Sequence, residues 1–125
     1  NLNIQTGEAM ERILREIRLA SSVNVGSSVL GSNPGKLLIN TVVSSTDSTP
    51  ITREFFLSGS TLVMREGGSA DTQLTSETDI TSIIFRRITT GKSQAVRIEM
   101  SGQDGFNKTL SSANFYGTAI LRGSY

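Results

Sequence analysis

The chain has 125 residues and a formal net charge of +1, and it contains no Cys, His or Trp. Its length suits one domain, which we expect to span residues 1–125. The missing residue types exclude thiol nucleophiles, disulfides, Cys-ligated metal sites and the commonest general base, and the near-neutral charge argues against a partner recognised mainly by electrostatics.

The first segment has the periodicity of an amphipathic helix. Between Thr6 and Ala20, apolar residues recur every three or four positions, which places them on one side of an α-helix, with charged residues opposite. We expect this apolar stripe to pack on a sheet, and each buried side chain to contribute about 1.5–3 kcal/mol. The packing residues that we predict are Met10, Ile13, Leu14 and Ile17.

One apolar residue of the helix departs from this stripe. Leu19 projects roughly opposite Met10 on a helical projection. With the neighbouring Arg12 and Arg15 it is our candidate for a contact with another subunit. The alternative is a single exposed leucine without functional meaning, which is common on protein surfaces.

After a Gly- and Ser-rich loop at 26–35, the hydrophobic period changes from 3.6 to 2, which predicts β-strands. The predicted strands cover residues 36–43, 51–57, 61–65, 78–89, 94–100 and 113–122. We therefore expect an α+β fold, in which one N-terminal amphipathic helix within residues 1–22 packs on an antiparallel sheet of five or six strands within 36–122.

Few residues indicate chemistry. A Ca²⁺ site could use Asp104 and Asn107, but a single carboxylate is too few for tight binding, so we expect no metal or other cofactor. No nucleophile motif is present, and we expect no enzymatic activity. Arg86 and Arg87 are candidates for a ligand contact, although the chain does not interleave aromatic and basic residues as a nucleic-acid platform does, so nucleic acid is not the expected partner.

Four segments in order resemble the type IV pilin-like (prepilin-type) family, in particular its minor pilins and the minor pseudopilins of type II secretion. The first resembles the segment that closes the long N-terminal helix of such proteins, and the others resemble three of their later stretches. The four matches lie between residues 10 and 122, so they are spread over most of the chain. They are Met10–Ser21, Leu74–Ser76 with Ile80, Ile83 and Phe85, Ala95–Met100, and Gly117–Arg122.

This resemblance implies a structural subunit of a type IV pilus or a secretion pseudopilus, which assembles through its N-terminal helix. Its partners would be other pilin or pseudopilin subunits and the inner-membrane assembly machinery. It would belong to the bacterial cell envelope, with the head periplasmic or extracellular, or in a surface filament. The family's leader and apolar anchor are missing, so we expect residues 1–22 to be the second half of a longer helix, and the membrane to be reached only through a segment before Asn1.

Two other interpretations stay open. The domain could be a surface-exposed head that binds a ligand, in DNA uptake, adhesion or contact with secretion cargo. It could also be a secreted, hydroxyl-rich domain unrelated to pilins.

Overall fold

The computed structural model describes residues 2–104 and 112–122. Within these ranges the chain forms one α-helix, α1 (Leu2–Leu19), one short 3₁₀ helix, η1 (Val25–Ser27), and eight strands. The strands are β1 (Ser22–Val23), β2 (Lys36–Ser44), β3 (Asp47–Ser58), β4 (Thr61–Glu66), β5 (Thr72–Gln73), β6 (Thr78–Thr90), β7 (Ser93–Asp104) and β8 (Ser112–Ile120).

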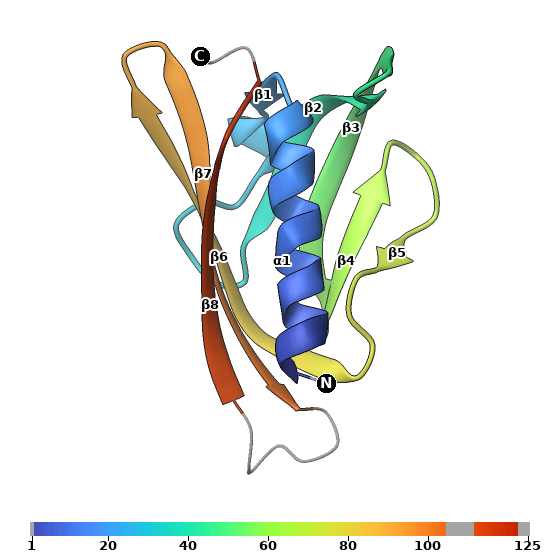
Figure 1. Ribbon diagram of the computed structural model, residues 1–125, viewed down its shortest axis with the longest axis vertical. Coiled ribbons are helices and arrows are strands. Elements are labelled where there is room, and N and C mark those ends of the chain that lie inside the picture. Colours follow the sequence, from blue (N-terminus) through green and yellow to red (C-terminus); the bar gives the residue numbers. More distant parts are fainter. Residues whose placement is uncertain (1, 105–111, 123–125) are drawn as a thin grey trace.

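The strands form two antiparallel sheets, so the predicted single sheet of five or six strands is wrong. One sheet has the order β1-β2-β3-β4-β5 and the other the order β6-β7-β8 (Figure 1). More than half of the described residues lie in strands, against one 18-residue α-helix, which makes the fold mostly β rather than the expected α+β.

The sheets separate because β6 does not continue the ladder that ends at β5. The edge of β6 that faces away from β7 is taken by the loop before β2. Gly31 donates its N–H to the carbonyl of Phe85, and Gly35 donates to that of Ile83, both at 2.8 Å. A backbone group that is already paired cannot join a second ladder, so this loop ends the three-stranded sheet.

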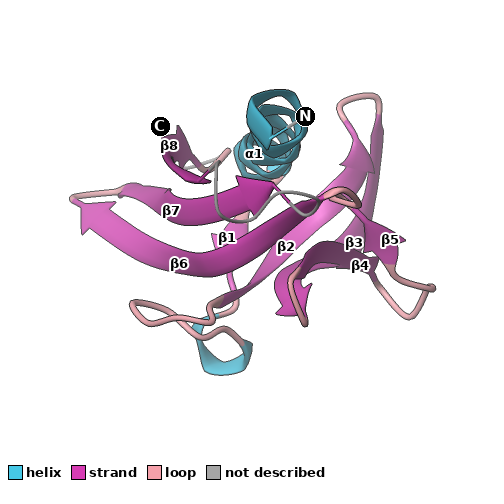
Figure 2. Cartoon of the chain, turned by 90° about the horizontal axis from the view of Figure 1, so that it is seen from below, coloured by secondary structure: helices cyan, strands magenta, loops and turns pink. Residues whose placement is uncertain are grey.

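Helix α1 lies on the inner side of both sheets, closest to β8 and next to β2 and β7 (Figures 1 and 2). Its apolar stripe enters one core cluster that also contains side chains from both sheets. Met10, Ile13, Leu14 and Ile17 are each at most 6% exposed. The helix therefore joins the two sheets through a shared hydrophobic core.

Glycine is required where the helix crosses β8. A Cβ atom added to Gly117 would lie 2.9 Å from Leu14 Cδ1 and 3.0 Å from Met10 Sδ, which is closer than side-chain atoms normally approach. The missing side chain at this position lets α1 pack directly on the backbone of β8.

Candidate functional site

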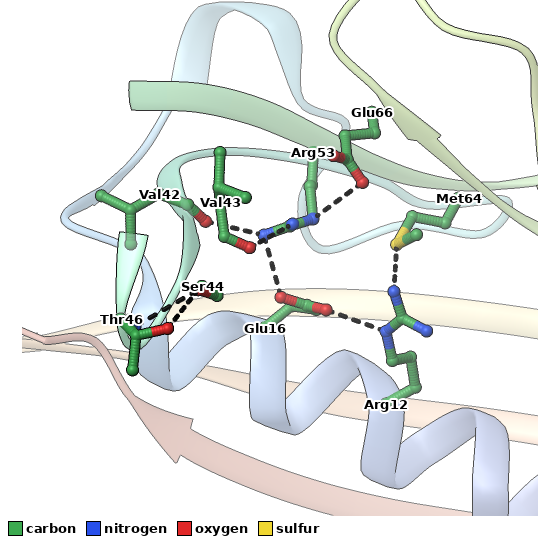
Figure 3. A network of polar contacts seen from close by, with 9 residues as sticks. All are labelled: Arg12, Glu16, Val42, Val43, Ser44, Thr46, Arg53, Met64 and Glu66. Atoms are coloured by element: carbon green, nitrogen blue, oxygen red, sulfur yellow. Dashed lines mark hydrogen bonds and ion pairs between the residues drawn. The ribbon is translucent and has the colours of Figure 1, made fainter. Parts of the chain in front are cut away.

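A buried ion pair joins α1 to the five-stranded sheet (Figure 3). Glu16 projects from the helix beside the apolar stripe, and Arg53 projects from β3 on the same face as the buried Phe55. Their exposed fractions are 7% and 4%. Arg53 Nη1 donates to Glu16 Oε1 at 3.0 Å.

The guanidinium of Arg53 is also held by backbone. Nη1 donates to the carbonyl of Val42 and Nη2 to that of Val43, both at 3.0 Å. The register of β2 and β3 shifts between Val42 and Ser44, and Pro50, which is paired with Val42, has no N–H to donate. This irregularity leaves two neighbouring carbonyls available to one guanidinium.

Further contacts complete the network around the ion pair. Arg12 Nε donates to Glu16 Oε2 at 2.8 Å, so both carboxylate oxygens accept a charge-assisted hydrogen bond. A second nitrogen of Arg12 contacts the sulfur of Met64 at 3.7 Å. Arg53 Nε lies 3.5 Å from Glu66 Oε2, which is an ion pair without a hydrogen bond. The network thus links α1 with β2, β3 and β4 and defines where the helix sits along the sheet.

The candidate residues for a subunit contact lie together on this flank of the helix. Arg12, Arg15 and Leu19 line a shallow hollow of about 320 Å³ between α1 and the β2–β3 turn, where Val43 and Ser44 form the opposite wall. Leu19 is half-buried, and it also borders a neighbouring hollow. The structure therefore places these three residues on a single concave surface.

Arg86 and Arg87, the candidates for a ligand contact, are both exposed on β6. Arg86 Nε donates to Glu99 Oε2 at 2.7 Å across the outer face of the three-stranded sheet, and Arg87 Nε donates to Gln94 at 3.1 Å. The hydrogen bond from Arg86 lowers the pKa of Glu99 below the usual range of glutamate. Both arginines border an open hollow of about 450 Å³ that Val25 and Ile88 also line.

Of the two residues considered for Ca²⁺, Asn107 lies outside the described residues, and Asp104 ends β7. Within residues 2–104 and 112–122, no group of three or more Asp or Glu side chains is arranged to hold a metal ion. Over the same residues, no helix has both the length and the apolar character needed to cross a membrane.

Glu16 and Arg53 were not singled out from the sequence, although both carry a recognisable signal. Glu16 follows Ile13 by three residues and precedes Ala20 by four, so it belongs to the apolar side of the helix. Arg53 alternates with Phe55 and therefore faces the same side of its strand. Opposite charges at positions that the periodicity assigns to the core indicate a buried ion pair.

Comparison with protein-family models, with curated proteins and with solved structures found no match for this chain.

Proposed function

We propose that the chain is a structural subunit, a minor pilin or pseudopilin, of a type IV pilus or a type II secretion pseudopilus, and that it assembles through its N-terminal helix. The four ordered segments that resemble this family support the proposal. The arrangement of α1 supports the proposal independently, because one side of the helix is buried against the sheets and the other side is exposed.

The observation that carries the proposal is this asymmetry of α1. Its inner side is buried against both sheets and held by the Glu16–Arg53 ion pair. None of the described strands covers its outer side, and Figure 1 looks onto it. The exposed residues of that side are Ile4, Glu8, Glu11, Arg15 and Arg18. Charged residues of both signs along an open helix side can form salt bridges with the helices of neighbouring subunits, as the flanking positions of coiled coils do.

The same arrangement is suited to a mechanical function. Force applied along the helix would reach the sheets through the buried ion pair and the apolar stripe together. Glu16 is held by two arginines, and Arg53 by two carbonyls as well, so a sliding movement of α1 must break several directional contacts at once. A subunit that is drawn into a filament by its helix needs such a connection.

The reading frame that encodes the chain provides the first test. We expect an apolar segment of about 20 residues shortly before Asn1, which is the length that crosses a bilayer. A reading frame without such a segment would contradict the proposal.

The second test compares two charge reversals in the full-length protein within its own host. Arg15→Glu changes the open side of α1 and the hollow that Leu19 and Val43 line, whereas Lys92→Glu makes the same charge change in the exposed turn between β6 and β7. We expect Arg15→Glu to reduce filament number or secretion, and Lys92→Glu to reduce it less, at equal protein levels. Equal assembly by both variants and the wild type would exclude this flank as the subunit contact.

A ligand-binding head is the second candidate function, and the open hollow beside β6 is the observation that favours it. The hollow combines two guanidinium groups with the apolar side chains of Val25, Leu30 and Ile88, which suits an anionic ligand with an apolar part. If the ligand is DNA, Arg87→Ala should weaken a gel shift at low salt, and Arg122→Ala should not. Absence of binding by the wild type at low salt would exclude DNA.

A further inference from the structure

Most edges of the two described sheets are protected against pairing with another chain. The outer strands of the larger sheet, β1 and β5, have two residues each. In the smaller sheet, the loop before β2 pairs with β6 at Ile83 and Phe85, and β6 carries Arg86 and Arg87 beside that position. Short strands, covering loops and charged residues are the usual devices that prevent edge-to-edge association.

Strand β8 has none of these devices. Its nine residues pair with β7 in one uninterrupted register from Ser112 to Ile120, without a bulge. The strand contains no Pro, Lys, Arg, Asp or Glu. No described residue pairs with its other edge. A long, regular and uncharged edge strand is a ready template for a further strand.

The backbone groups that face this open edge can be identified from one hydrogen bond. The N–H of Leu121 donates to the carbonyl of Gln94 at 2.9 Å, which continues the β7–β8 ladder by one residue. In an antiparallel ladder the paired residues alternate, so the odd-numbered residues of β8 exchange hydrogen bonds with β7. The even-numbered residues therefore direct N–H and C=O toward the open edge, and the central three are Asn114, Tyr116 and Thr118.

Side chains leave the edge accessible. The carboxamide oxygen of Asn114 accepts a hydrogen bond from Ser101 at 2.7 Å, and the ring of Tyr116 lies 5.3 Å from the guanidinium carbon of Arg97. Both partners belong to β7, so both side chains lean away from the open edge. On the opposite face, Phe115 packs against the core but is only partly buried. A strand added beside β8 would cover the rest of its ring.

We infer that the open edge of β8 binds an extended segment of a partner polypeptide, which adds a fourth strand to the three-stranded sheet beneath α1. The segment pairs with the N–H and C=O groups of Asn114, Tyr116 and Thr118. Its side chains facing the helix are uncharged, because they cover Phe115 and lie beside Gly117 and Ala119. Backbone pairing gives the affinity in this mode of recognition, and the alternate side chains give the specificity.

A second copy of the chain does not suit this edge. Symmetric pairing of two β8 strands would place them about 4.8 Å apart, with both copies of α1 on the same side of the joined sheet. Because α1 packs directly over Gly117 of β8, the two helices would also approach to roughly that distance. Packed helix axes need about 8–10 Å, so the helices would collide. A single extended segment brings no helix with it.

This inference does not depend on a filament function, since it concerns the edge of the sheet and not the open side of α1. A negative result in the filament assays would leave it intact. Likewise, failure of strand addition would leave the proposed subunit function untouched.

The test uses a fluorescent peptide with the sequence of residues 112–120, whose edge groups are complementary to the open edge in antiparallel orientation. Thr118→Pro removes one N–H that faces this edge and none that pairs with β7, whereas Thr118→Val keeps the N–H. Measured by fluorescence anisotropy, Thr118→Pro should weaken binding about tenfold, as expected for a lost hydrogen bond and a hindered neighbour. Thr118→Val should bind like the wild type. A peptide with proline in place of its central residue, which corresponds to Tyr116, is the negative control.

Amide hydrogen exchange of the unmodified chain gives a second measurement that needs no variant. The N–H groups of Asn114, Tyr116 and Thr118 should exchange much faster than those of Phe115 and Gly117, and should become protected when the peptide binds. Absence of peptide binding, or equal binding by Thr118→Pro, would overturn the inference. A dimer of the chain that Thr118→Pro abolishes would overturn the choice of partner.

Discussion

The two flanks of helix α1 attach to the two sheets by different means. Toward the five-stranded sheet, Glu16 and Arg53 form a buried, hydrogen-bonded ion pair. Toward the three-stranded sheet, Met10 and Leu14 pack on the bare backbone of Gly117. The first flank is held by a charged pair with directional hydrogen bonds, and the second by close apolar packing.

This difference between the two flanks shows how one helix can be attached to two sheets. Apolar packing supplies most of the free energy, but it tolerates small sliding movements, because burial has no direction. The ion pair adds less net stability, since removing two charges from water is costly, but its geometry is strict. We interpret the polar flank as the element that selects the position of α1, and the apolar flank as the element that stabilises it.

Arg53→Ala should have the largest effect on this arrangement. It leaves Glu16 buried with only Arg12 as a partner, and it leaves the carbonyls of Val42 and Val43 without a donor. Removing one partner of a buried pair destabilises a protein by about 3–5 kcal/mol. Urea unfolding followed by circular dichroism would measure the loss.

A double variant separates the charge from the packing. Arg53→Met combined with Glu16→Leu removes both charges and fills the space with apolar groups, so it should recover much of the stability that Arg53→Ala loses. Recovery should be incomplete, because the two carbonyls stay unpaired. An Arg53→Ala loss below about 1 kcal/mol, the size of an exposed ion pair, would contradict the interpretation of the polar flank.

The apolar flank is tested by Gly117→Val. Its side chain would enter the space of Leu14 and Met10, and overpacking of this kind costs about 1–3 kcal/mol. Gly68→Val is the matched control, because a Cβ atom at Gly68 meets no atom within 4 Å. If both variants unfold at the same urea concentration, close approach at β8 is not a source of stability.

Two buried threonines near the five-stranded sheet differ in whether the side-chain hydroxyl has a hydrogen-bond partner. The hydroxyl of Thr41 has no hydrogen-bond partner among the described residues, whereas that of Thr75 accepts from the N–H of Leu62 at 3.0 Å. Thr41→Val should therefore stabilise the protein by about 1 kcal/mol, and Thr75→Val should destabilise it by about 1–3 kcal/mol. Thermal unfolding of both variants would show shifts of opposite sign. Shifts in the same direction would contradict this assignment.

Local periodicity was enough to predict the helix and most strands. The apolar spacing from Thr6 to Ala20 predicts a helix that the structure extends from Leu2 to Leu19. The alternation in 94–100 predicts the centre of β7. The two-residue strands β1 and β5 escaped prediction, because two residues cannot display a period.

The division into two sheets could not be read from the sequence. It depends on hydrogen bonds from Gly31 and Gly35 to a strand about 50 residues later, and alternation within a strand says nothing about which strand is its neighbour. The polar network is similar, because Glu16 and Arg53 are 37 residues apart and their pairing requires the tertiary fold. The sequence nevertheless shows that both residues occupy positions that the hydrophobic periodicity assigns to the core.

The smallest effect is expected where the same residue types meet in solvent, at Arg86 and Glu99. Their side chains are 46% and 26% exposed, against 5% and 9% for Arg53 and Glu16. Because the hydrogen bond from Arg86 lowers the pKa of Glu99 in the folded state, its contribution to stability is complete above the pKa of an unfolded glutamate and is lost as the pH falls through the lowered value. An NMR titration of the Glu99 carboxyl should show its midpoint rising in Arg86→Ala and in high salt, with little change in urea unfolding at neutral pH.

A midpoint that neither change moves would mean that the pKa of Glu99 is set by its other neighbours. A large loss of stability in Arg86→Ala would instead mean that burial does not separate the two ion pairs.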